Sequence, residues 1–489
     1  MTSPLQGHSP VPPPGCPAHQ PAADGPPAEP AASGLPVLYG EAFAADPDAT
    51  YRRLREQGPA HEVEIAPGVE AVLVTGYDAA LEVLRSPYFS KDARRWTAVA
   101  EGKVPADNQV VPLMGWRPSL WFADGDRHLR LRTPVDDALD RVNPHQLRAS
   151  VQRSASELIE RFAADGHADL VAQYAGPIPT LVFAQLFGCS GDLSHRMAAA
   201  CLRMIDAEPT TAQQGGMDLA QCLGELIGRK RGAPGADVTS WMMAHPAGLT
   251  DEEMVHQLVV LIGAGTVPQS AWISTATMML LSDDRFATHL TGGSLTVADA
   301  LNEVLWLHSP LSNFSFVYAV QDYVLKDRRT GAQTRIPSGV PVLISHAAAN
   351  TDPALATDRG LRAANTSHLA WGAGPHACPA SDIAGIIADV AIETLLDRLP
   401  DMYLAADADA LTWRPGPFHR TLTALPVRFT PSATTPPPPA TNDGALPWKP
   451  SPAPSSTPPA PTSTARPPAS VPEARPRRWS FLGRSRRGR

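Results

Sequence analysis

One cysteine stands in a context that could do chemistry. Cys378 lies in the segment HLAWGAGPHACPASDIAG, where Gly372 and Gly374 permit backbone conformations that other residues resist. A helix is expected to begin just after the thiol, and the N-terminus of a helix lowers a thiol pKa and presents amide donors to a sulfur anion. The remaining cysteines need be no more than small apolar residues: Cys16, Cys189, Cys201 and Cys222.

A thiolate held on a glycine-rich turn is what an axial ligand of haem iron requires. The glycines let a flat macrocycle approach the backbone, and nearby amides tune the electron density that sulfur gives to iron. Trp371 stands beside this turn, and His376 could reach a haem carboxylate. The alternative is a buried structural cysteine on a glycine turn. The pattern favours the haem site, with Cys378 as the iron ligand.

Residues 371–380 resemble the cysteine-loop signature of the cytochrome P450 family. Trp371 stands where the family usually has phenylalanine, and Ala380 stands at the last glycine, whereas the other positions agree in order and spacing. The resemblance covers about residues 37–430. It implies the P450 fold, with haem b between a long central helix and the cysteine loop.

A second segment, ADGDRHLRLRTPV, resembles the family's helix that binds the haem propionates. The match places a histidine at His128 and an arginine at Arg132. Residues four apart share one face of a helix, so both cations could hold adjacent carboxylates. The resemblance thus implies these cofactor-binding residues: His128, Arg132, Trp371, Gly372, Gly374, His376 and Cys378.

The oxygen side of the site departs from the family pattern. The family's Ala-Gly-x-acid-Thr corresponds to Ala264, Gly265, Thr266, Val267 and Pro268, so the acid and the alcohol that usually deliver protons are both absent. Without a donor, reducing equivalents would be lost as peroxide. A proline inside a helix leaves the carbonyl four residues earlier without its amide partner, and that carbonyl could hold a water. The alternative is a kink that only widens the pocket.

Three other side chains of this helix could complete a different proton relay. They are Thr266, Gln269 and Ser270. The catalytic residues expected on the oxygen-side helix are therefore Ala264, Gly265, Thr266, Pro268 and Gln269.

Two further family positions are changed. The family's Glu-x-x-Arg falls on Glu303 and Trp306, so the usual ion pair cannot form, and a buried unpaired glutamate would be costly. We expect Glu303 to find a partner in Arg359 or Arg362, to be helped by His308, or to be protonated. Val317 stands where many bacterial members have a propionate-binding arginine. Haem should still bind through the remaining residues.

The elements around these residues are mainly helical, with short strands, which indicates an α+β fold. Helices are expected over residues 46–58, from His145, from Thr250 for about 30 residues and from about Pro379 to Leu399. Strands are expected over residues 69–76, 314–320 and 340–344, and a hairpin over the closing residues 410–429. The helix from Thr250 is apolar on nearly all faces, so it should be buried.

Proline divides the chain of 489 residues into three parts. Of 52 prolines, 11 lie in residues 1–36 and 16 in residues 431–489, and neither segment shows apolar periodicity. We expect a disordered lead (1–36), one folded domain (37–430) and a disordered tail (431–489). The widely spaced cysteines suggest neither a disulfide framework nor a zinc site, and the sequence indicates neither a signal peptide nor an apolar run of bilayer length. A soluble cytoplasmic protein is expected.

The tail is basic, with nine Lys or Arg residues against Asp443 and Glu473. Its end, RPRRWSFLGRSRRGR, is either a solvated tail or an element attracted to an acidic protein or an anionic membrane surface, which would make the protein peripheral to the membrane. No nucleic-acid partner is expected, because no binding fold accompanies the charge.

The resemblance implies a haem-thiolate monooxygenase. No flavin or nicotinamide fingerprint occurs, so electrons must come from a ferredoxin and a ferredoxin reductase. The substrate is expected to be an apolar small molecule bounded by residues 96–114 and 314–318. The alternative is a P450-fold haem protein without monooxygenase activity, acting as a scaffold, sensor or non-hydroxylating enzyme, with the basic tail as its docking element.

Overall fold

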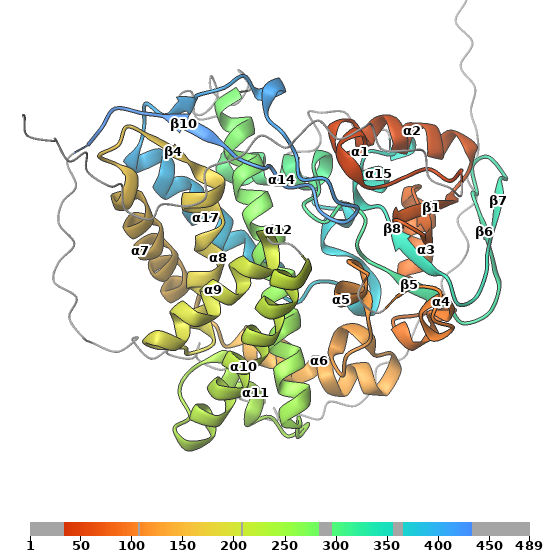
Figure 1. Cartoon of the computed structure of the whole chain (residues 1–489), viewed down its shortest axis with the longest axis horizontal. Coiled ribbons are helices and arrows are strands. Elements are labelled where there is room, and N and C mark those ends of the chain that lie inside the picture. Colours follow the sequence, from red (N-terminus) through yellow and green to blue (C-terminus); the bar gives the residue numbers. More distant parts are fainter. Residues whose placement is uncertain (1–33, 106–107, 207–208, 283–295, 356–364, 433–489) are drawn as a thin grey trace, which may run out of the picture. The chain divides into compact units, whose positions relative to one another are not determined.

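A long helix separates a helical side of the molecule from a sheet side. The computed structural model describes residues 34–432, apart from 106–107, 207–208, 283–295 and 356–364. Helix α12 (Asp251–Ser282) runs between the helices α7 to α10 on one side and the main sheet on the other (Figure 1). The expected α+β fold dominated by helices is confirmed.

The α-helices of the described residues are α1 (Gly40–Ala45), α2 (Pro47–Gln57), α3 (Tyr77–Arg85), α4 (Thr97–Ala100), α5 (Val111–Met114), α6 (Gly125–Asp140), α7 (Pro144–Phe162), α8 (Pro177–Leu186), α9 (Asp192–Asp206), α10 (Pro209–Gly232), α11 (Val238–Met243), α12, α14 (Val297–Leu307), α15 (His346–Asn350) and α17 (Ser381–Arg398). Short 3-10 turns are η1 (Ala93–Arg95), η2 (Leu120–Phe122), η4 (Pro353–Leu355), η5 (Leu369–Trp371), η6 (Gly374–His376) and η7 (Ala408–Ala410), and η3 (Val171–Ala175) is a π-helical turn.

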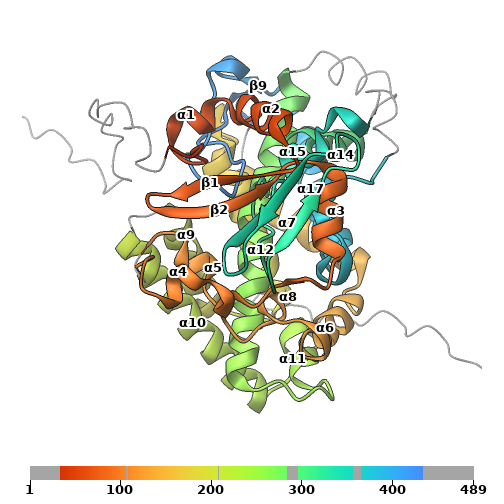
Figure 2. The same ribbon diagram turned by 90° about the vertical axis from the view of Figure 1, so that its right-hand side faces the viewer.

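The main sheet has five strands in the order β1-β2-β8-β5-β3 (Figure 2). Only β2 and β8 run parallel in it, with Val72 opposite Val342. The strands of this sheet are β1 (Ala60–Ala66), β2 (Val69–Val74), β3 (Phe89–Ser90), β5 (Val317–Ala319) and β8 (Pro341–Ile344). Two smaller sheets comprise β4 (His167–Asp169), β10 (Pro426–Arg428) and β9 (Tyr403–Leu404), and β6 (Tyr323–Lys326) with β7 (Gln333–Ile336).

Capping residues fix where the helices begin. The Asp46 side chain accepts from the Ala49 amide at 2.9 Å, and Pro47 opens α2 at a position that needs no amide donor. At the start of α12, Thr250 and Glu253 form a reciprocal pair, because each side chain accepts from the backbone amide of the other. Both starts agree with the expectations from the sequence.

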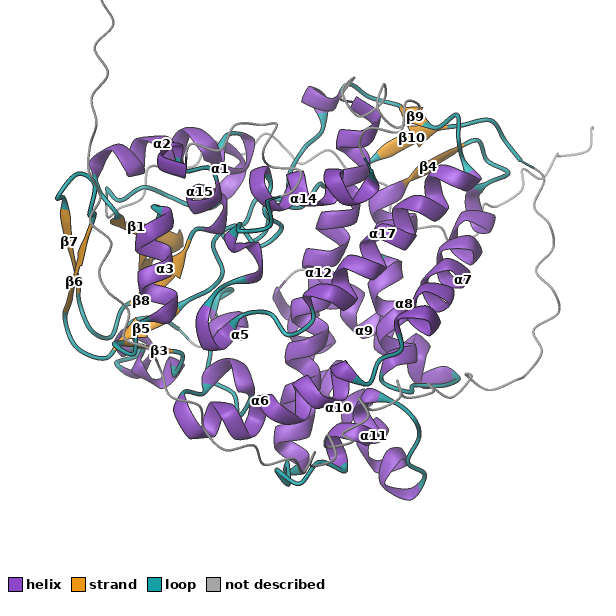
Figure 3. Ribbon diagram, turned by 180° about the vertical axis from the view of Figure 1, so that it is seen from behind, coloured by secondary structure: helices purple, strands orange, loops and turns teal. Residues whose placement is uncertain are grey.

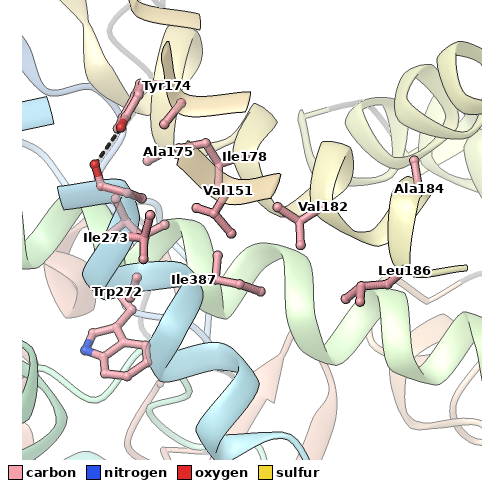
Figure 4. Packing of buried hydrophobic residues seen from close by; sticks show 14 of the residues in the cluster. Val151, Tyr174, Ala175, Ile178, Val182, Ala184, Leu186, Trp272, Ile273 and Ile387 are labelled. Atoms are coloured by element: carbon pink, nitrogen blue, oxygen red, sulfur yellow. Dashed lines mark hydrogen bonds between the residues drawn. The ribbon is translucent and has the colours of Figure 1, made fainter. Parts of the chain in front are cut away.

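Helix α12 is the structural centre of the larger hydrophobic cluster. Ile273 of α12, Ile387 of α17 and Ile178 of α8 all belong to this cluster (Figure 4). The Tyr174 hydroxyl donates to the Ala391 carbonyl at 2.6 Å, which joins η3 to α17. Within the described residues, α12 is the one helix long and apolar enough to cross a membrane, and its burial here explains that composition.

Two sequence expectations need correction. The run 314–320 forms a strand only over Val317–Ala319, because its first residues turn into an aromatic cluster instead of pairing. The closing segment pairs with itself as an antiparallel hairpin only over residues 412–423, where Trp413 bridges Leu422 and the amides of Arg414 and Thr423 donate to the carbonyls of Thr421 and Thr412. Its last part, β10, pairs instead with β4 and β9. This small sheet lies at the ends of α7 and α17, away from the main sheet (Figure 3).

Candidate functional site

The loop before Cys378 is shaped by two glycines in the left-handed region. Gly372 has φ +71° and Gly374 has φ +72°, conformations that other residues rarely adopt. A Cβ on Gly374 would also lie 2.6 Å from the Leu84 carbonyl oxygen of α3. The Cys378 amide then donates to the Trp371 carbonyl at 2.8 Å, which closes the loop. Glycine at position 374 is therefore required by both conformation and packing.

The thiol lies at the start of α17. The Ala380 amide points at the Cys378 sulfur, 3.4 Å away, so the alanine at the family's last glycine still supplies a donor. Burial nevertheless raises the pKa of the Cys378 thiol, while the Ala380 amide and the Arg132 charge oppose that rise. The expected lowering of the pKa by the helix terminus is thus outweighed by desolvation.

Trp371 lies between the loop and α12. Its ring meets that of Trp272 edge-on, with centroids 5.3 Å apart. The indole nitrogen of Trp272 donates to the Leu301 carbonyl of α14 at 2.9 Å. The cysteine loop is in this way positioned against the central helix by two tryptophans.

His128 and His376 come together although they are far apart in the sequence. Their ring centroids are 4.0 Å apart, and His128 Nε2 and His376 Nδ1 are buried with no hydrogen-bond partner among the described residues. Burial lowers the pKa of both rings, that of His376 to about 2. Two neutral rings with free nitrogen atoms are suited to a polar ligand between α6 and the cysteine loop.

Arg132 shares the face of α6 with His128, as the spacing predicts. Its Nε donates to Asp136 at 2.5 Å, and its Nη1 lies 3.5 Å from the Pro375 carbonyl of the cysteine loop. The guanidinium therefore reaches the loop and retains donors for a second acceptor.

The sequence reasoning missed one cation in this region. Lys91 follows strand β3, is 3% exposed, and donates through Nζ to the Phe316 carbonyl at 2.9 Å. The Asp124 carboxylate accepts from the Lys91 amide at 3.0 Å and lies 3.9 Å from His376 Nε2. The available signal was a lysine two residues after the aromatic pair Tyr88-Phe89, at the end of a short apolar segment.

The oxygen-side residues of α12 face different neighbours. Gly263 and Ala264 are exposed although the helix is buried continuously from Gln269 to Leu280. A Cβ on Gly265 would lie 2.2 Å from the Phe183 ring, so this glycine permits close packing on α8. The helix is thus largely buried, as its composition indicates, and Gly263 and Ala264 lie on an accessible stretch of it.

The polar side chains proposed for a relay are already hydrogen-bonded. The Thr266 hydroxyl donates to the Ile262 carbonyl at 2.9 Å, and Gln269 Nε2 donates to the Ala384 carbonyl of α17 at 3.0 Å. Pro268 lies inside the helix and has no N–H to give to the Ala264 carbonyl.

Trp306 takes the place of the family's arginine with a neutral contact. Its indole nitrogen donates to the Asn365 carbonyl at 2.8 Å, and its ring meets His368 edge-on at 5.7 Å. The Asn350 side chain links Leu305 to the segment that precedes the cysteine loop. Its amide nitrogen donates to the Leu305 carbonyl, and its oxygen accepts from the Leu369 amide. The expected partners of Glu303, Arg359 and Arg362, lie outside the described residues, and the His308 ring stacks on Trp413.

Known proteins resemble this chain along most of its length. No protein-family model matches it. Cytochrome P450 monooxygenase PikC from Streptomyces venezuelae is 32% identical over 81% of this chain and 94% of the relative. The 6-deoxyerythronolide B hydroxylase of Saccharopolyspora erythraea is 26% identical over 81% of this chain and 99% of the relative. The solved structure of CYP154C4 from Streptomyces sp. ATCC 11861 superposes with a TM-score of 0.73 at 27% identity, covering 81% and 98% of the two chains.

The relatives are named for monooxygenase and hydroxylase reactions, which favours an enzyme over a non-catalytic haem protein. In the structure the cysteine loop precedes α17, and the rings of His128 and His376 are in contact beside it. The chain therefore belongs to the cytochrome P450 family and is a haem-thiolate monooxygenase.

Proposed function

We propose that this P450 oxidises an apolar small molecule, of the kind named for its relative the 6-deoxyerythronolide B hydroxylase, with electrons from a ferredoxin and a ferredoxin reductase. One observation supports the apolar substrate. The two segments expected to bound it, residues 96–114 and 314–318, pack in one hydrophobic cluster. Phe314 and Trp121 are only partly buried there, with ring centroids 5.5 Å apart, so aromatic surface remains available to a ligand.

The residues present fit haem b. Cys378 offers a sulfur to the iron, and the free nitrogens of His128 and His376, with Arg132, offer donors to the two propionates. Bound haem supplies the iron that activates dioxygen for oxidation of the substrate. The protein holds that group, excludes bulk water from it and delivers protons to its oxygen side.

For proton delivery we propose the Ala264 carbonyl. Pro268 leaves this carbonyl without a helical N–H, and Ala264 lies on the accessible stretch of α12. A water held by this oxygen can donate a proton onward. The Thr266 hydroxyl oxygen, two residues along the chain, can still accept a hydrogen bond while it donates to Ile262.

Turnover with surrogate partners tests the proposed function. The full chain, a surrogate ferredoxin, its reductase and NADPH would be incubated with 6-deoxyerythronolide B and related macrolactones that shift the haem spectrum. We expect a product one oxygen atom heavier that depends on the ferredoxin. If every such ligand returned all reducing equivalents as peroxide, the proposal would be wrong.

We further propose that the enzyme is cytoplasmic and that its basic tail associates with an anionic membrane surface. The support is the charge of residues 431–489, nearly all of which lie outside the described residues. Deletion of 433–489 should abolish co-sedimentation with vesicles that contain phosphatidylserine. Unchanged sedimentation would refute the membrane role, and loss of binding to an acidic protein alone would assign the tail to a protein partner.

A further inference from the structure

A buried lysine near the cysteine loop lacks a carboxylate partner. Lys91 Nζ donates to one carbonyl, that of Phe316, and lies 4.4 Å from the centroid of the Trp121 ring. Among the described residues no carboxylate lies within 4 Å of Nζ. An ammonium has three donors, and a buried one is stable only when an anion or several acceptors surround it. The surroundings of Lys91 are therefore suited to an added anion.

The groups beside Lys91 are one carboxylate, whose hydrogen bonds are already taken up, and a pair of histidines. The Asp124 carboxylate is already shared between the Ser90 hydroxyl and the Lys91 amide, at 2.6 and 3.0 Å. From there it lies 3.9 Å from His376, whose ring contacts His128. The charge of Lys91 also contributes to the lowered pKa of His376, which agrees with their proximity. One bound carboxylate group could therefore contact this lysine and the histidine pair.

The strand register relates Lys91 to a missing arginine. Strands β3 and β5 are antiparallel, with Ser90 opposite Tyr318, and Lys91 directly follows the end of β3. Val317 is the position of the propionate-binding arginine that this chain lacks, and the Lys91 ammonium bonds to the carbonyl of the residue before it. A cation thus lies beside the backbone of this position, on the side of β5 where the Phe316 ring packs.

We propose that Lys91 is a haem-propionate ligand that replaces the arginine absent at Val317. Lys91 is a cofactor-binding and positioning residue rather than a catalytic one. Its ammonium neutralises a propionate next to His376, and its removal leaves that carboxylate with fewer donors. The alternative is a purely structural lysine that only holds the Phe316 carbonyl and packs on Trp121.

Haem retention and spectroscopy distinguish a propionate-binding Lys91 from a purely structural one. The variants are Lys91→Met, Lys91→Arg and the double variant Lys91→Met with Val317→Arg, and the control is Lys103→Met, whose ammonium is exposed and pairs with Glu101. Holoenzyme would be measured for the rate of haem transfer to apomyoglobin, for the propionate bending bands in resonance Raman spectra and for the reduction potential.

We expect Lys91→Met to lose haem about tenfold faster, to shift the propionate bands and to lower the reduction potential, because a cation near the haem is lost. Adding Val317→Arg to Lys91→Met should restore the rate of haem loss, the propionate bands and the reduction potential. In Lys91→Arg and in the control Lys103→Met these three quantities should stay near their native values. Unchanged bands and potential in Lys91→Met would overturn the proposal. If Lys91→Met does not fold, the neutral polar variant Lys91→Gln takes its place, and unchanged propionate bands and reduction potential in Lys91→Gln would likewise refute the proposal.

Discussion

The cysteine-loop side and the oxygen side of the haem site both depart from the family pattern, but direct contacts replace the missing groups only on the first, whereas the second relies on the proposed water at the Ala264 carbonyl. On the cysteine-loop side, Ala380 still directs its amide to the sulfur, and Trp306 supplies a hydrogen bond where the arginine is absent. On the oxygen side, Thr266 and Gln269 bond to backbone carbonyls. Holding a cofactor can be achieved by several neutral contacts, whereas proton delivery needs a donor at one place.

The largest effect should follow removal of the iron ligand. Cys378→Ala should abolish the red-shifted band of the reduced carbon monoxide complex, because that band requires a thiolate ligand. The measurement is the difference spectrum of the purified protein. Cys189→Ala, a buried cysteine on the helical side, is the matched control and should keep the band. A retained band in Cys378→Ala would show that another residue binds the iron.

Acid should destabilise the cysteine-loop side. Burial lowers the pKa of His346 and of His368 from 6.5 to about 4, so both rings are neutral when folded and bind protons on unfolding. The unfolded state then binds more protons, and stability is lost as pH falls below 6.5. Between about pH 7 and pH 5, protonation of these two histidines in the unfolded state should lower the free energy of unfolding by roughly 3 kcal/mol.

Urea unfolding across that pH range measures this loss. His368→Asn and His346→Gln, which cannot titrate, should each flatten the acid limb of the stability curve. Equal slopes in native protein and both variants would place the acid sensitivity elsewhere.

Gly374→Ala should cost roughly 2–4 kcal/mol of stability, because its φ of +72° strains an alanine and its Cβ would meet the Leu84 carbonyl at 2.6 Å. Gly224→Ala is the matched control, since Gly224 lies inside α10 with nothing within 4 Å of an added Cβ, and it should stabilise by about 1 kcal/mol. Thermal unfolding of holoenzyme compares the two. Similar Tm values would mean that the loop relaxes around the added methyl group.

The same contrast shows what a sequence can predict. The cysteine loop was predictable residue by residue, because glycine spacing and the helix start are local properties of the chain. The long helix was predictable from its cap at Thr250 and its apolar length. Lys91 and the role of Trp306 were not, since each depends on a partner more than 50 residues away, Phe316 and Asn365. The raised pKa of Cys378 was also missed, because burial depends on tertiary packing.

A smaller loss should follow removal of the neutral contact at Trp306. Trp306→Phe keeps the ring but loses the donor to the Asn365 carbonyl, which should cost about 1 kcal/mol in unfolding by urea and speed haem loss a few-fold. Trp241→Phe on α11, remote from the loop, should leave haem loss unchanged. If Trp306→Phe also left haem loss unchanged, the segment that precedes the cysteine loop would be held by the Asn350 contacts alone.

The smallest structural change tests the oxygen side. Pro268→Ala restores an N–H that can bond to the Ala264 carbonyl, so a water held there would lose its acceptor. The share of electrons released as peroxide should then rise several-fold at unchanged haem content, measured as peroxide against NADPH consumed. Val267→Ala, adjacent but without effect on helical hydrogen bonding, should leave the ratio as it is. A fall in the peroxide share of Pro268→Ala would instead mean that the proline hinders protonation, and that the missing acid and alcohol are compensated from outside α12.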